Sequence, residues 1–205
     1  AAETPKRGGW LKIATDSTAV GLDRHITLAF ASLTFFEHCY ETLIRYDAEM
    51  KLEPALATSW EQPDNITYLF HLRKGVKFHN GDEMTSEDVK FTFERMLDPA
   101  FQAPRGSTFQ SISKIETPDR YTIKFTMSGP FPNFLNIIGS PWYAAIVSKA
   151  AVQKYGNLQN EMIGTGPFKL KKYEHGIKGV YERFADYWDK PKPYIDGFDF
   201  IVMKD

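Results

Sequence analysis

The chain has 205 residues, of which 42% are hydrophobic and 25% are charged, and it contains 16 Phe, 10 Tyr and 4 Trp. This composition excludes a wholly disordered protein, and the length allows one large domain or two small ones. With 25 basic and 26 acidic residues the net charge is −1, which argues against a nucleic-acid partner, because phosphate binding draws on a surplus of cations.

The N-terminal part of the chain predicts one strand and one helix. The first three residues, Ala-Ala-Glu, suit the pattern left by cleavage of a signal peptide, which would place the protein outside the cytoplasm. Trp10–Thr15 alternates apolar and polar side chains and predicts a strand, and a loop of small residues follows at 16–23. Apolar residues near helical spacing predict a helix over much of Ser32–Ile44, with the single cysteine, Cys39, buried in it. One cysteine forms neither an internal disulfide nor a thiolate metal cluster.

The middle of the chain predicts a β-meander followed by a well-signalled helix. Ile66–Leu72 and Val76–His79 are expected to be two of its strands, and an Asn-Gly turn follows them. Thr85 suits a helix N-cap, with Asp88 three residues later in a pattern related to the capping box. An apolar stripe then continues until Asp98, where a following proline ends the helix.

Further elements are predicted up to the last residues. Two strands at 112–116 and 121–127 flank a Pro-Asp turn and predict a hairpin. The remaining expected elements are a short helix at 134–138, a short buried strand at 144–147, a helix at 149–155 closed by Gly156, and strands at 168–173, 180–184 and 197–203. The last strand needs neighbours on both faces, so we expect the chain to be part of a longer protein.

Candidate catalytic and metal-binding groups each have a structural alternative. Glu83, Glu87 and Asp88 would suit a glycosidase-type carboxylate pair, but acidic groups in the first turn of a helix stabilise its dipole, and we favour that role. The five histidines show no i, i+4 spacing. His71 and His79 would lie on neighbouring strands, where a metal pair is the alternative to structural histidines, which we favour. No nucleophile motif is present, so we predict no catalytic residue, no metal site and no cofactor.

Three loop features are candidates for binding. Gly164-Thr165-Gly166 lacks the Lys-Ser/Thr end of a phosphate-binding loop and predicts a tight chain reversal. Trp142 follows a Gly-Ser-Pro loop, where ligand contact and packing are weighed equally. Arg105 has no carboxylate near it in the sequence and suits bidentate capture of a ligand carboxylate, but from the residues alone we favour a solvated arginine.

Several segments together carry a family pattern. The most specific is Tyr68–Asp82, YLFHLRKGVKFHNGD, which continues into Thr85–Val89, TSEDV. The supporting segments are 52–60, 164–168 and 183–188. In this order the segments resemble the extracytoplasmic solute-binding proteins of the oligopeptide, dipeptide and nickel family (bacterial family 5) that feed ABC importers. The resemblance spans nearly all of the chain.

The resemblance implies a mixed α/β (α+β) fold of the two-lobe periplasmic-binding-protein type, of which these residues would supply most of lobe one. Residues 1–45 and 166–205 would form the central sheet part of lobe one. Residues 46–165 would form an inserted α+β subdomain, and lobe two would be absent.

The resemblance also implies where a ligand would bind. The loop after the first strand would offer backbone groups of Thr18, Ala19 and Val20 to an extended ligand, because strand-like pairing needs only main-chain groups. Arg105 falls where some relatives have a ligand-facing aromatic residue, and Trp142 falls near the mouth of the cleft. The chain departs from the family pattern at Arg24, where a proline is more usual, and this departure concerns the shape of the loop.

The function implied is that of the substrate-binding component of an ABC importer. It would capture peptides or amino-acid-derived solutes in the periplasm and deliver them to the permease subunits, its partners. Binding of a nickel chelate, haem or an oligosaccharide by the same fold is an alternative. A small hydrolase using Asp82 with His79 is an alternative of another class. A stand-alone structural or interaction module would follow if the gene ended after Asp205.

Overall fold

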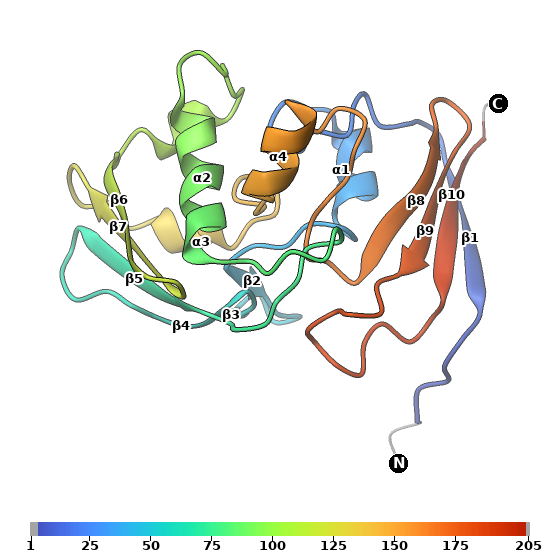
Figure 1. Ribbon diagram of the computed structural model, residues 1–205, viewed down its shortest axis with the longest axis horizontal. Coiled ribbons are helices and arrows are strands. Elements are labelled where there is room, and N and C mark those ends of the chain that lie inside the picture. The colour runs from blue at the N-terminus through green and yellow to red at the C-terminus, as the bar shows by residue number, and fades with distance from the viewer. Residues whose placement is uncertain (1–3, 204–205) are drawn as a thin grey trace.

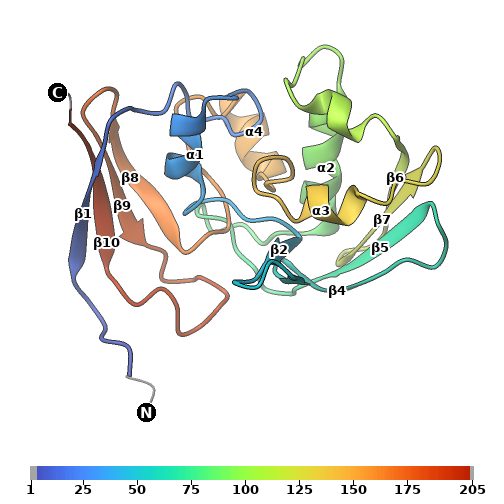
Figure 2. The same cartoon turned by 180° about the vertical axis from the view of Figure 1, so that it is seen from behind.

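The computed structural model describes residues 4–203, so the first three residues, on which the signal-cleavage prediction rests, lie outside the described range. Two four-stranded sheets lie at opposite ends of the elongated molecule, with helices between them (Figure 1, Figure 2). The fold is mixed α/β, as the sequence predicts. No helix among the described residues is long and apolar enough to cross a membrane.

The first sheet joins the two ends of the chain in the strand order β1-β10-β9-β8. Its bounds are β1 Trp10–Thr15, β8 Phe168–Glu174, β9 Lys178–Arg183 and β10 Gly197–Val202. β10 pairs in parallel with β1 and antiparallel with β9. Aromatic side chains fill its inner face, where the Tyr181 and Phe198 rings stack with centroids 4.7 Å apart. The helix α1, Phe30–Phe36, adds Phe35, whose ring lies 5.1 Å from that of Phe200.

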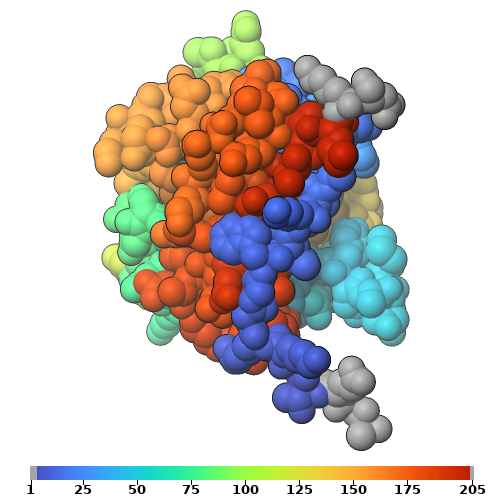
Figure 3. Space-filling view, turned by 90° about the vertical axis from the view of Figure 1, so that its right-hand side faces the viewer, coloured from blue at the N-terminus to red at the C-terminus, as the bar shows by residue number. Residues whose placement is uncertain are grey.

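β1 is the edge strand of this sheet within the described residues. Its Trp10 and Leu11 side chains are 44% and 50% exposed. Figure 3 shows β1 in blue on the surface of the molecule, running beside β10 in red.

The second sheet has the strand order β4-β5-β7-β6, and every neighbouring pair is antiparallel. Its bounds are β4 Ala57–Glu61, β5 Thr67–Leu72, β6 Ile112–Asp119 and β7 Thr122–Met127. The helix α2, Ser86–Leu97, covers this sheet through Phe93, whose ring lies 4.9 Å from that of Phe125. The predicted capping box is confirmed, because Thr85 and Asp88 exchange both of its hydrogen bonds.

Five further short elements complete the described fold. They are β2 Ile44–Tyr46, β3 Leu52–Pro54, the 3-10 helix Gly106–Phe109, α3 Phe134–Ile138 and α4 Lys149–Tyr155. The helix α4 ends at Gly156, as predicted, where φ is 76°, a conformation that glycine adopts without strain. The predicted domain boundaries at 45 and 166 stay a prediction.

The predicted helix over Ser32–Ile44 is wrong in extent, because α1 ends at Phe36. The carbonyls of His38 and Cys39, which would continue the helix, accept hydrogen bonds from the amides of Phe168 and Gly166 instead. Cys39 is fully buried as expected, but it lies in a turn and not in a helix.

Two predicted strands are also absent from the described part of the chain. Val76–His79 forms only an isolated bridge, because the Phe78 and His79 amides donate to Asp82 and Gly164. The expected meander is therefore wrong, and β5 pairs with β4 and β7. The segment 144–147 is buried but irregular, since two of its amides donate to the Glu41 carbonyl and to the Thr92 hydroxyl.

Candidate functional site

The loop that follows β1 is held by the first sheet and by α1. The Thr18 hydroxyl lies 2.6 Å from the Tyr173 hydroxyl, which itself donates to the Ala19 carbonyl at 2.6 Å. The Val20 amide donates to the Ser32 hydroxyl at 3.0 Å. Ala19 is fully buried, whereas Val20 is 72% exposed. Of the three predicted ligand-binding residues here, Val20 therefore presents its side chain to solvent.

A buried ion pair fixes the next part of the loop to α2. Arg95 donates to both carboxylate oxygens of Asp23, at 3.0 and 2.6 Å, and also lies 3.1 Å from Nδ1 of His25. Burial raises the pKa of the Asp23 carboxyl, but the hydrogen bond and charge of Arg95 outweigh it and lower the pKa overall. Burial, reinforced by Arg95, lowers the pKa of His25 to about 4, so this ring is neutral at pH 7.

Sequence reasoning missed this ion pair. Its members are 72 positions apart in the sequence. A charged residue such as Arg95 is expected in an amphipathic helix, so it did not stand out. The available signal was Asp23-Arg24-His25, a run of titratable residues in a loop of small ones.

Arg105 and Trp142, both predicted to bind ligand, meet beside this loop. The Arg105 guanidinium lies 4.8 Å from the Trp142 ring centroid and donates to the Thr27 carbonyl at 3.1 Å. The Trp142 ring lies 5.9 Å from that of Phe30, which is 75% exposed. The structure thus brings Arg105 and Trp142 together with the loop after β1.

Exposed apolar side chains surround this group. Val20, Leu28, Phe30 and Tyr143 are 72%, 54%, 75% and 37% exposed. Apolar surface with a few fixed polar groups is typical of ligand sites. We call the surface formed by residues 17–30, Arg105 and 142–143 the loop face.

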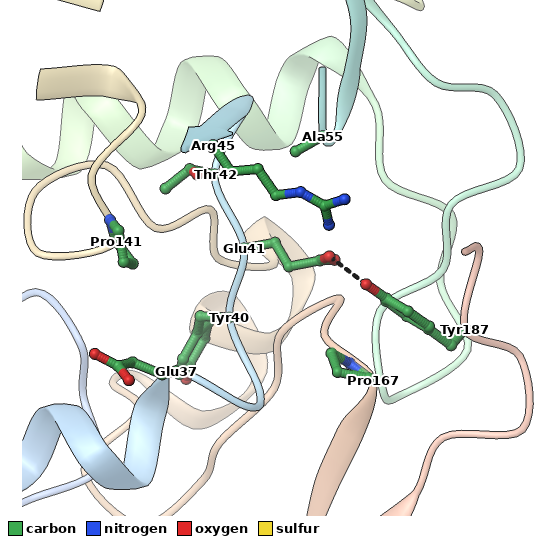
Figure 4. Close-up of a pocket in the computed structure, with 9 residues that line it drawn as sticks. All are labelled: Glu37, Tyr40, Glu41, Thr42, Arg45, Ala55, Pro141, Pro167 and Tyr187. Carbon is green, nitrogen blue, oxygen red and sulfur yellow. Dashed lines mark hydrogen bonds between the residues drawn. The ribbon is translucent and has the colours of Figure 1, made fainter. Parts of the chain in front are cut away.

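A cavity of about 240 Å³ lies beside the chain that leads into β2, and Figure 4 shows Glu41, Arg45 and Tyr187 among its lining residues. Glu41 lines it, and its carboxylate accepts hydrogen bonds from Thr165, Tyr187 and Trp188 at 2.9, 2.8 and 3.0 Å. Burial raises the pKa of Glu41. Both carboxylate oxygens are therefore engaged, and the hydrogen bond from Thr165 ties residues 164–166 to the chain near β2.

The glycine segment, residues 164–166, serves close packing. A Cβ on Gly166 would lie 2.6 Å from the His38 carbonyl oxygen, and one on Gly164 would meet the Cys39 carbonyl oxygen at a shorter distance still. The sequence predicts only a tight chain reversal here. The structure adds the reason for the glycines, which is the close approach of this backbone to that of His38 and Cys39.

The other candidate groups have structural partners. Glu83 pairs with Arg120 at 2.9 Å and Glu87 with Lys149 at 3.2 Å. His71 contacts Glu61, and His79 contacts the Gly166 carbonyl. In residues 4–203 no group of three or more His, Cys, Asp or Glu side chains is placed to hold a metal ion.

Known proteins share this fold and are identical to this chain at about a third of the aligned positions. The glutathione-binding protein GsiB of Escherichia coli (strain K12) is 33% identical over 195 residues, which cover 94% of this chain and 38% of that protein. AgaA from A. tumefaciens R10, solved with agropinic acid, is 34% identical with a TM-score of 0.88, covering 94% of this chain and 39% of its own. DppA from Helicobacter pylori, solved with the peptide STSA, is 32% identical with a TM-score of 0.88, covering 97% and 43%.

These likenesses place the chain in the class of solute-binding proteins and not among enzymes, as the sequence predicts. The profile of bacterial extracellular solute-binding proteins, family 5 Middle, matches residues 51–205. The chain belongs to this family. It spans about two fifths of the length of the relatives named above.

Proposed function

We propose that the loop face is one wall of a solute-binding cleft and that the solute is a peptide or an amino-acid-derived compound. The observation that carries the proposal is a loop fixed at both ends, by Tyr173 and by the Asp23–Arg95 pair, that still exposes apolar groups. The relatives' ligands, which are glutathione, agropinic acid and a peptide, support this chemical class.

In this proposal the ligand lies along the main chain of Thr18, Ala19 and Val20. Extended ligands pair through backbone amides and carbonyls, so the side chains there are free to vary. Since the Ala19 carbonyl accepts from Tyr173 and the Val20 amide donates to Ser32, the ligand pairs with the main-chain groups that these two bonds leave. Arg105 and Trp142 contact the ligand from the side. The opposite wall is supplied by residues outside this chain, and closure is driven by the ligand's higher affinity for the closed state.

We further propose that residues 1–45 with 166–205 and residues 46–165 act as two parts of one lobe. The two sheets support this division, because one uses strands within 10–15 and 168–202 and the other uses strands within 57–127. The protein works in the periplasm and delivers its solute to the permease subunits of an ABC importer.

Isothermal titration of the protein expressed from the intact reading frame tests this function. The panel contains glutathione, a dipeptide and a tetrapeptide, together with a nickel chelate, haem and an oligosaccharide. We expect saturable one-to-one binding of a peptide-type solute. Binding only of the last three ligands, or no binding at all, would refute the proposal.

A further inference from the structure

Two arginines of the loop face, Arg24 and Arg105, lack a carboxylate partner among the described residues. Arg24 is 3% exposed, its guanidinium donates to the Pro141 carbonyl and it lies 5.6 Å from the Phe36 ring. Arg105 donates to the Thr27 carbonyl. Within residues 4–203, neither guanidinium has a carboxylate oxygen within 4.0 Å.

This pattern differs from that of the other strongly buried arginine. Arg95 is 8% exposed and is neutralised by Asp23. Burial, together with the positive charge of Arg105, lowers the pKa of Arg24 to about 10. The exposed Glu37 acts on Arg24 only from beyond ion-pair distance. The two cations, which no ion pair neutralises and Glu37 offsets only from a distance, therefore favour an anionic group next to Trp142.

We propose that Arg105 binds a carboxylate of the solute, with Arg24 as a positioning residue behind it; this rests on the proposed function and names the acidic group of its ligand. The Arg105 guanidinium packs 4.8 Å from the centroid of the Trp142 ring, and a guanidinium held in this way suits bidentate pairing with a carboxylate. Arg24 holds the Pro141 carbonyl just before Trp142 and adds positive charge.

The test compares charged and neutral peptides on the protein from the intact reading frame. The probes are Ala-Glu-Ala with a free C-terminus, the same peptide amidated, and Ala-Gln-Ala. We expect removal of one of the two carboxylates to weaken binding at least about tenfold. The amidated peptide and Ala-Gln-Ala show whether that carboxylate is terminal or in a side chain. In R105Q the peptides with two carboxylates and with one should bind with nearly equal affinity, while R105K should keep part of the difference.

Arg73 supplies a matched control. It lies 4.2 Å from the Trp188 ring and donates to the Ala55 carbonyl, so it shares the kind of surroundings that Arg105 has but lies away from the loop face. R73Q should keep the charged-to-neutral ratio of the unsubstituted protein. If R105Q still binds peptides with an unchanged ratio, this inference is wrong and the proposed function stands. If no peptide binds the unsubstituted protein, both are wrong.

Discussion

Replacing Arg95 with methionine should strongly destabilise the protein. The Asp23 side chain is fully buried and the Arg95 side chain is 6% exposed, so R95M leaves a buried carboxylate without its cation. Breaking such a pair costs roughly 3–5 kcal/mol, against a total stability of roughly 5–15 kcal/mol. Two backbone amides, of His25 and Leu158, would remain as its donors.

Urea unfolding followed by tryptophan fluorescence measures this loss. The control is R120M, because the Arg120–Glu83 pair is exposed and worth at most about 1 kcal/mol. The double variant D23N/R95M removes both charges and should recover much of the stability. The reasoning is refuted if R95M costs no more than R120M.

Two further predictions concern stability. His25 is buried, and its pKa is about 4 in the folded protein against 6.5 in the unfolded chain, so between pH 4 and 6.5 the unfolded state binds the extra proton. The free energy of unfolding should therefore rise with pH across that window, by up to roughly 3 kcal/mol. In H25Q, unfolding measured as a function of pH should show a shallower slope over the same window. Gly164→Ala should cost about 1–3 kcal/mol by overpacking against Cys39, whereas Gly129→Ala, which meets nothing within 4 Å, should melt like the parent; equal melting of both variants would contradict the packing argument.

Local signals predicted the parts of the fold that depend on neighbouring residues. The helix α2 followed from its capping box and apolar stripe, and the β6–β7 hairpin followed from its turn. The extent of α1 did not, because its end is fixed by hydrogen bonds from Gly166 and Phe168, far along the chain.

The candidate site was predictable only in part. Arg105 and Trp142 were singled out as loop residues, but their contact needs the folded chain. The Asp23–Arg95 pair joins a loop to a helix across the fold, and although the run Asp23-Arg24-His25 stands out in the sequence, nothing there identifies Arg95 as its partner.

Hydrogen–deuterium exchange with and without a bound peptide shows whether the loop face is the wall that the solute covers. The protein from the intact reading frame is used with the peptide that binds most tightly in the isothermal titration. We expect added protection to concentrate in residues 16–30 and 140–144, while the β6–β7 hairpin is unchanged. Protection confined to the hairpin or to the cavity beside Glu41 would contradict it.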